Sequence, residues 1–172
     1  MVERLSRLKA AAVALDRPGC VVLAADTVVV LSGRSLGKPA DSDEARRMLQ
    51  ALRGRAHEVH TAVTVLSGAG MWTETATSRV TMHAYPEAEL DAYIATGDPL
   101  DKAGAYAIQH PDFALVKAWD GCYTAIMGLP LALTERLLRT AGLVVPVDAA
   151  VACPAMTGAG CCLDGQRCPR AT

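Results

Sequence analysis

The stretch Val21-Val22-Leu23-Ala24-Ala25-Asp26-Thr27-Val28-Val29-Val30 is an apolar run with a single carboxylate in its middle. Its density of valine, leucine and threonine predicts a strand that is buried on both faces. A carboxylate there is costly unless it is hydrogen-bonded, paired with a cation or bound to a metal. A glycine-flanked lysine follows at Gly37-Lys38-Pro39, and a short loop could return Lys38 to Asp26. This pattern suggests a phosphate or metal site; the alternative is an aspartate that caps the end of the strand.

The composition is that of one domain with an aliphatic core. The chain has 172 residues, of which 51% are hydrophobic and only 4% aromatic. The net charge of -1, from 17 basic and 18 acidic residues, argues against a nucleic-acid polymer as partner. No apolar run reaches the length of a membrane span, and residues 1–10 are charged, unlike a signal peptide. We therefore expect a cytoplasmic protein that does not bind a membrane.

Hydrophobic periodicity predicts an alternation of helices and strands around the central strand. The first helix is expected at residues 1–15, with an apolar face of Leu5, Leu8, Ala12 and Leu15. A second helix is expected to begin in the acidic run 41–44 and to end at Gly54. The other expected elements are a turn at 32–35, a hairpin of strands at 57–66 and 72–83, helices at 86–94 and 131–140, and short strands at 115–119 and 123–127.

Residues 146–172 differ in composition from the rest of the chain. Alanine, glycine, proline and cysteine dominate without a period, which predicts a tail that is disordered or held by its cysteines. Cys153, Cys161, Cys162 and Cys168 supply enough thiolates for a zinc or an iron–sulfur site. The spacing lacks Cys-x-x-Cys, so the alternative is a disordered tail that binds no metal.

Several stretches together resemble the Maf family of nucleoside triphosphate pyrophosphatases, in family order over residues 1–143. They are Val2-Glu3-Arg4-Leu5 to Lys9-Ala10, Ala25-Asp26-Thr27-Val28-Val29, Gly37-Lys38-Pro39, His57-Glu58-Val59-His60-Thr61-Ala62-Val63, Asp101-Lys102-Ala103-Gly104-Ala105-Tyr106-Ala107-Ile108-Gln109, and Gly121-Cys122-Tyr123 to Gly128-Leu129-Pro130-Leu131. Gln109 and Thr61-Ala62-Val63 resemble the branch that acts on dTTP and UTP.

This resemblance implies an α/β fold at residues 1–145, with a mixed, twisted sheet, flanking helices and a central cleft. It implies hydrolysis of a nucleoside triphosphate between the α and β phosphates, which clears non-canonical or excess nucleotides. The products are the monophosphate and pyrophosphate, and the cofactor is a divalent cation, Mg²⁺ or Mn²⁺. Family members are commonly dimeric, so a homodimer is also implied.

The resemblance also assigns roles to single residues. Asp26 would be the catalytic carboxylate, which orients and deprotonates the attacking water or helps to hold the metal. Lys9, Lys38 and Lys102 would offer their charges to phosphate oxygens. Gln109 would bind a base or a coordinated water, and Thr27 would add a hydroxyl beside Asp26.

Each of these roles has a plainer alternative. Lys9 and Lys38 could be solvated lysines, and Lys102 could simply pair with Asp98 or Asp101. His57 and His60 are expected to be structural, because a histidine pair on one strand without a third ligand is weak evidence for zinc.

Two departures from the family pattern qualify the expected activity. The family normally opens with a strand and a loop that carries Ser and paired Arg residues, whereas Met1 directly precedes the segment that matches here. Either a longer active protein exists, or this chain is a catalytically impaired nucleotide-binding pseudoenzyme. A third reading makes the cysteine-rich tail a metal or redox sensor. Ala125 is the second departure, because the family commonly has Asn there.

Overall fold

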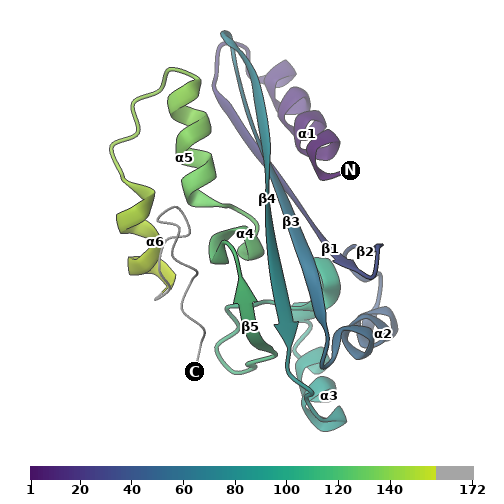
Figure 1. The fold of residues 1–172 in the computed structure, drawn as a ribbon. Helices are drawn as coiled ribbons and strands as arrows, with labels where there is room; N and C mark the ends of the chain where they lie inside the picture. Colours follow the sequence, from purple (N-terminus) through teal and green to yellow (C-terminus); the bar gives the residue numbers. More distant parts are fainter. Residues whose placement is uncertain (158–172) are drawn as a thin grey trace. The chain divides into compact units, whose positions relative to one another are not determined.

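The computed structural model describes residues 1–157, which form six α-helices and five β-strands (Figure 1). The helices are α1 (Val2–Asp16), α2 (Ser42–Leu52), α3 (Glu87–Ala95), α4 (Tyr123–Met127), α5 (Leu131–Thr140) and α6 (Ala149–Thr157), with short 3₁₀ helices η1 (Asp98–Asp101) and η2 (Ala103–Ala105). The strands are β1 (Val22–Leu31), β2 (Arg34–Leu36), β3 (Ala56–Ser67), β4 (Gly70–Met82) and β5 (Val116–Asp120). This architecture confirms the predicted α/β class. Within residues 1–157, no helix is long and apolar enough to cross a membrane.

The strands form one sheet in the order β2-β1-β3-β4-β5. The strands pair in antiparallel directions, which narrows the predicted mixed sheet to an antiparallel one. A two-residue turn joins β1 to β2, because Ser32 and Gly33 both have positive φ angles, 50° and 79°. Such a turn matches the natural twist of a hairpin. The predicted turn at 32–35 is therefore shorter, and Arg34 already pairs with Leu31.

The described residues fall into two compact units, and the boundary between them passes through β1, β3 and β4. The first unit contains residues 1–27, 60–77 and 121–157. The second contains residues 28–59 and 78–120. The predicted central strand also changes character along its length: Val28 and Val29 are buried, whereas Leu23 in the first unit is 41% exposed. Burial on both faces was thus predicted correctly only for the second half of β1.

The core of the first unit lies between α5 and β3. Val63 and Val65 pack against Leu133 and Leu137, all of them buried. Helix α6 packs on α5 in turn, through a small cluster that includes Ala132 and Cys153. Residues 149–157 form this helix, in the part of the chain where the sequence predicted a tail that is disordered or held by its cysteines. The sequence of this helix has no hydrophobic periodicity that would predict it, and Pro154 lies inside it.

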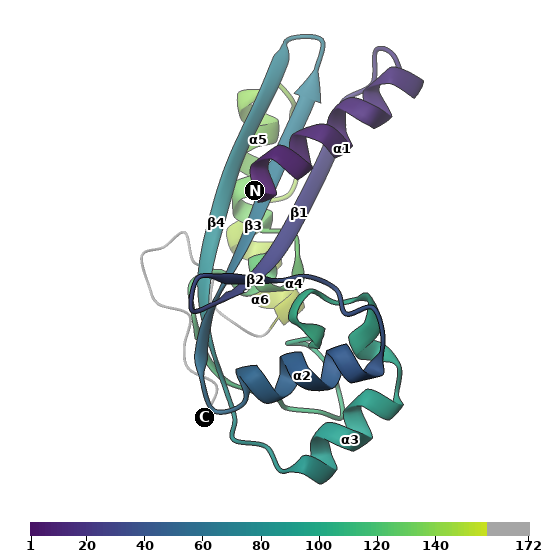
Figure 2. The ribbon, with the colours of Figure 1, turned by 90° about the vertical axis from the view of Figure 1, so that its right-hand side faces the viewer.

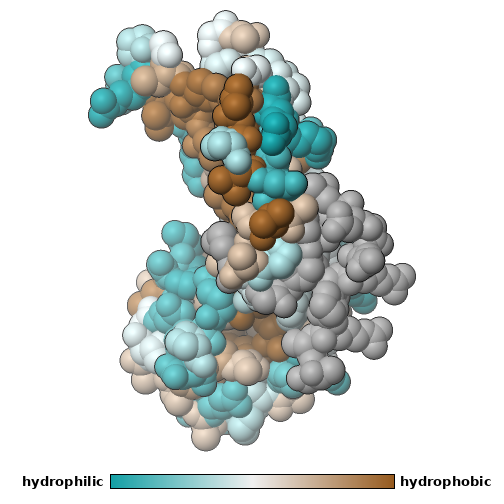
Figure 3. Space-filling model, turned by 90° about the vertical axis from the view of Figure 1, so that its left-hand side faces the viewer, coloured by the Kyte–Doolittle hydropathy of each residue, from teal (hydrophilic) through white to brown (hydrophobic). Residues whose placement is uncertain are grey.

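Hydrophobic side chains also remain on the surface of the first unit. Val144 and Val151 are 92% and 71% exposed. Figure 3 faces the side on which α5 and α6 lie and shows hydrophobic side chains gathered on its upper half.

Helix α1 packs on the strands of the first unit through the face that carries Ser6 and Ala10. Its buried residues are Val2, Ser6 and Ala10, whereas Leu8 is 57% exposed. Ser6 Oγ lies 3.0 Å from the carbonyl oxygen of Ala24 and 2.8 Å from Thr64 Oγ1. The predicted leucine face was wrong because hydrogen bonds to hydroxyl and carbonyl groups of the strands determine which side of α1 faces the sheet.

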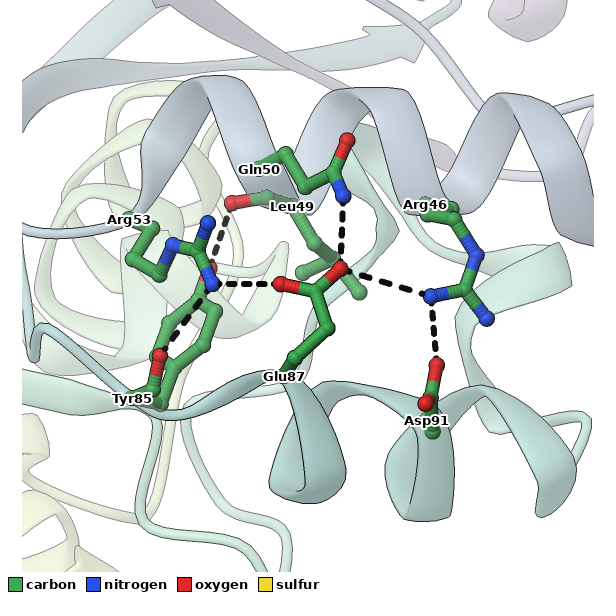
Figure 4. A network of polar contacts seen from close by, with 7 residues as sticks. All are labelled: Arg46, Leu49, Gln50, Arg53, Tyr85, Glu87 and Asp91. Carbon is green, nitrogen blue, oxygen red and sulfur yellow. Dashed lines mark hydrogen bonds and ion pairs between the residues drawn. The ribbon is translucent and has the colours of Figure 1, made fainter.

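Helices α2 and α3 pack against each other in the second unit (Figure 2). Asp41 caps the start of helix α2, and its side chain accepts a hydrogen bond from Glu44 N at 2.7 Å. A polar network then joins the two helices at the surface (Figure 4). Glu87 on α3 accepts hydrogen bonds from Gln50 on α2 and from Arg53 directly after α2, both at 2.7 Å. These bonds hold the pKa of Glu87 below its usual range.

Residues 123–127 form helix α4, where the sequence predicted a strand. Gly128 ends this helix with φ 112°, and Leu129 N donates to the carbonyl oxygen of Thr124 at 2.9 Å. Leu131 N also donates to Thr124 Oγ1 at 3.1 Å, which connects α4 to the start of α5. An apolar run of this length does not distinguish a strand from a helical turn, so only the glycine after it could have indicated the helix.

Candidate functional site

Asp26 and Lys9 form an ion pair in the first unit. Lys9 Nζ lies 2.6 Å from Asp26 Oδ1 and 3.3 Å from the carbonyl oxygen of Ala25. The Asp26 side chain is only 14% exposed, so this pair compensates a carboxylate that is largely removed from water. Ser6 fixes α1 on the strands, and Lys9 follows three residues later on the same face of the helix. The structure thus brings two of the predicted site residues into contact.

Thr27 belongs to a different set of contacts in the same unit. Its Oγ1 lies 2.8 Å from Thr61 Oγ1, and Thr61 Oγ1 donates to the carbonyl oxygen of Ala125 at 2.7 Å. A hydroxyl has one proton, so Thr61 must accept from Thr27. Neighbouring side chains of a strand point to opposite faces, and Thr27 accordingly faces α4 while Asp26 faces α1. The hydroxyl of Thr27 therefore does not lie beside the Asp26 carboxylate.

The hydroxyl chain from Thr27 to Ala125 was not predicted from the sequence. It joins strands β1 and β3 and helix α4, which are far apart along the chain. The residue that could best have indicated this chain of hydroxyls is Thr61, a polar residue within an expected strand. The structure buries Thr61 fully. A buried hydroxyl requires a partner, but the sequence does not say which.

The segments that carry Lys38 and Lys102 are joined in the second unit. Gly104 N donates to the carbonyl oxygen of Gly37 at 2.9 Å, so the loop of Lys38 is tied to η2. Gly104 has φ 72°, and a Cβ there would come within 2.8 Å of the Val29 side chain, so only glycine fits. Together with the hydrogen bond from Lys102, the charges of Lys102 and Lys38 hold the pKa of Asp101 below its usual range.

Lys102 is held between two carboxylates. Its Nζ lies 2.6 Å from Asp101 Oδ1 and 3.2 Å from Asp98 Oδ1. The hydrogen bond to Asp101 is the main cause that raises the pKa of Lys102, and the bond and charge of Asp98 add to it. The ammonium therefore stays charged at neutral pH. The pairing with Asp98 and Asp101 was the plainer alternative for Lys102, and the structure shows both contacts.

Gln109 is exposed in the segment that follows η2. The second unit thus carries Lys38, Lys102 and Gln109, and the first unit carries Asp26, Lys9 and Thr27. Each unit by itself holds groups suited to phosphate chemistry. The first has a carboxylate with a cation, and the second has two cations with an amide.

The two histidines expected to be structural both have partners within their units. His57 is buried, its Nε2 lies 2.8 Å from the Tyr106 hydroxyl, and burial lowers its pKa to about 4. His60 Nδ1 lies 2.9 Å from Thr77 Oγ1. Within residues 1–157, no group of three or more His, Cys, Asp or Glu side chains is placed to hold a metal.

The predicted cysteine site is described only in part. Cys153 is buried on α6, in the cluster with Ala132 and Ala149. Cys161, Cys162 and Cys168 lie outside the described residues. A zinc or iron–sulfur site at these cysteines remains a prediction.

Comparison of the sequence with known proteins shows which family the chain resembles. The sequence profile of the Maf-like proteins matches residues 1–141. The dTTP/UTP pyrophosphatase of Thermomicrobium roseum is 50% identical over 145 residues, which are 84% of this chain and 66% of that protein. The dTTP/UTP pyrophosphatase of Pelotomaculum thermopropionicum is 47% identical over 144 residues, 83% of this chain and 75% of that protein.

A third relative, the dTTP/UTP pyrophosphatase of Bordetella pertussis, is 49% identical over 129 residues, 75% of this chain and 62% of that protein. The chain thus spans between 62% and 75% of the length of these relatives. The profile match covers most of the chain, and the identities are far above those expected by chance. The chain belongs to the Maf family.

Proposed function

We propose that this chain carries the chemistry of a nucleoside triphosphate pyrophosphatase that acts on dTTP and UTP. The names of the relatives at about 50% identity support this activity. The structural observation that carries the proposal is the largely buried Asp26 carboxylate paired with Lys9 in the first unit. A largely buried carboxylate with a cation beside it is suited to activate water near a phosphate.

The reaction is a displacement at the α-phosphorus. A water oxygen bonds to this phosphorus, the bond to the bridging oxygen of the β-phosphate breaks, and pyrophosphate leaves. Asp26 accepts the proton of the attacking water, and Lys9 stabilises the negative charge that develops on the neighbouring phosphate oxygens. Lys38, Lys102 and Gln109 are assigned to the binding of the rest of the substrate, because ammonium and amide groups are donors to phosphate and base oxygens.

A divalent cation fits this donor set. Mg²⁺ is commonly held by one or two carboxylates together with substrate phosphates, and Asp26 supplies such a carboxylate. When bound, Mg²⁺ or Mn²⁺ supplies charge neutralisation on the phosphates. The removal of divalent cations with EDTA should abolish turnover, and added Mg²⁺ or Mn²⁺ should restore it.

Release of pyrophosphate from dTTP and UTP tests the proposal. Asp26→Asn keeps the shape of the side chain but removes the base, so we expect turnover to fall by about a hundredfold or more. Asp16→Asn is the matched control, because Asp16 is an exposed carboxylate at the end of α1 and should be dispensable. Nucleotide binding by the unsubstituted chain without any turnover would instead support the pseudoenzyme.

The assembly and location of the chain are part of the same proposal. We infer a homodimer, which light scattering of the purified chain would show as twice the mass of 18.0 kDa. A cytoplasmic location is inferred together with this activity. A monomeric mass at micromolar concentration would contradict the dimer but leave the proposed chemistry intact.

A further inference from the structure

Tyr93 is a fully buried residue of α3 whose hydroxyl bonds to two different segments of the second unit. The hydroxyl donates to Asp98 Oδ2 at 3.0 Å and accepts from Ala107 N at 3.1 Å. Asp98 begins η1, which leads to Lys102, and Ala107 lies two residues before Gln109. One phenolic oxygen therefore connects the segments that carry two of the candidate substrate-binding residues.

The first connection leads to Lys102 through Asp98. One carboxylate oxygen of Asp98 accepts from Tyr93, and the other lies 3.2 Å from Lys102 Nζ. The backbone around Asp98 is fixed to the end of α3 as well, because its N–H donates to Thr96 Oγ1 at 3.1 Å. Tyr93 thus holds the Asp98 carboxylate, and Thr96 holds the Asp98 backbone, in the position from which Asp98 contacts the Lys102 ammonium.

The second connection leads to Gln109. The backbone N–H of Ala107 is fixed by the Tyr93 hydroxyl, and the ring of His110 contacts the Tyr93 ring edge-on at a centroid distance of 5.3 Å. Phe113 also packs on Tyr93, with ring centroids 5.2 Å apart. Gln109 lies between Ala107 and His110, which both contact Tyr93. The backbone that carries the exposed Gln109 amide is therefore held in place.

The Tyr93 hydroxyl is suited to this double role. Burial raises its pKa far above the ordinary value, and the neighbouring Asp98 carboxylate raises it further. The hydroxyl therefore keeps its proton and remains both a donor and an acceptor over the accessible pH range.

We propose that Tyr93 is a positioning residue that sets the Lys102 ammonium and the Gln109 amide in place for the substrate. The proposal rests on the proposed function, in which these two groups contact the nucleotide. Both groups meet the substrate in the ground state and in the transition state alike, so their displacement weakens binding and raises KM while kcat changes little.

Tyr93→Phe removes the hydroxyl and keeps the ring contacts. We expect KM for dTTP or UTP to rise about five- to tenfold, the size of effect that one lost hydrogen bond produces, with kcat within about twofold. Asp98→Asn should raise KM as well, because its neutral amide holds Lys102 less firmly.

Tyr85→Phe is the matched control. Tyr85 is also a buried tyrosine of the second unit, but its hydroxyl donates at 2.6 Å to the carbonyl oxygen of Leu49 on α2 (Figure 4). Both variants lose one buried phenolic hydroxyl, which makes two hydrogen bonds in Tyr93 and one in Tyr85. Only Tyr93→Phe should raise KM.

The deciding experiment combines kinetics with NMR on the full chain and both tyrosine variants. The proposal expects faster exchange of the Ala107 amide and shifted side-chain signals of Lys102 and Gln109 in Tyr93→Phe alone, together with the rise in KM. Unchanged KM in Tyr93→Phe, or an equal rise in both variants, would overturn it.

The NMR measurement separates this proposal from the proposed function. If the unsubstituted chain hydrolyses no triphosphate, the proposed function fails, and the positioning role is judged by the signals alone. Shifted Lys102 and Gln109 signals in Tyr93→Phe would then support it. Signals that match those of the unsubstituted chain would overturn it.

Discussion

At the scale of single residues, His57 makes stability depend on pH. Burial lowers its pKa from 6.5 to about 4, so the unfolded chain binds a proton more readily than the folded chain between these values. The contribution of His57 is fully present above pH 6.5 and is lost as the pH falls toward 4. We expect the free energy of unfolding to fall by about 2 to 3 kcal/mol over this window.

Urea unfolding between pH 4.5 and 7.5 measures this effect. His57→Gln should flatten the dependence, whereas His83→Gln, at an exposed histidine of the same unit, should preserve it. An identical pH dependence in the unsubstituted chain and in His57→Gln would show that other groups cause it.

Thr61 gives a second prediction at this scale. It is fully buried, donates to the carbonyl oxygen of Ala125 and accepts from Thr27. Thr61→Val removes both bonds and should lower the free energy of unfolding by about 1 to 3 kcal/mol. Thr134→Val is the control, because Thr134 is buried too but its Oγ1 has no hydrogen-bond partner among the described residues. Equal losses in both variants, measured by urea unfolding, would contradict the hydroxyl chain.

At the scale of elements, α1 shows how hydrogen bonds can outweigh hydrophobic periodicity. Its leucines suggest one face, but Ser6 and Ala10 face the strands and Leu15 is 84% exposed. Ala10→Gln places an amide at a fully buried position and should cost about 2 kcal/mol or more. Leu15→Gln introduces the same side chain at an exposed position and should stay within about 0.5 kcal/mol. A larger loss from Leu15→Gln would mean that the leucine face is the buried one.

Other elements were predictable from local chemistry alone. The caps and turns at Asp41, Gly54 and Ser32-Gly33 act within a few residues, so the sequence around them suffices. Helices α4 and α6 were missed because one is a single turn without a period and the other contains a proline. Their positions depend on packing against α5 and on Gly128, neither of which a short window of sequence reveals.

At the scale of the whole molecule, the motifs gave candidate site residues but not the contacts that these residues make. Lys9 and Asp26 were found as separate motif positions, and the structure pairs them. The contacts of Thr27 and Tyr93 could not be found this way, because Thr61 and Ala107 lie 34 and 14 residues away from them along the chain. Hydrogen bonds across such separations depend on tertiary structure, which local sequence patterns do not reveal.

The central claim is water attack at the α-phosphorus with Asp26 as base, and hydrolysis of dTTP in ¹⁸O-labelled water tests it most directly. Mass spectrometry of the products should find one ¹⁸O in the monophosphate and none in pyrophosphate. Asp26→Asn should form both products about a hundredfold or more slowly, while Asp16→Asn behaves like the unsubstituted chain. Label in the pyrophosphate, or undiminished turnover by Asp26→Asn, would contradict the account.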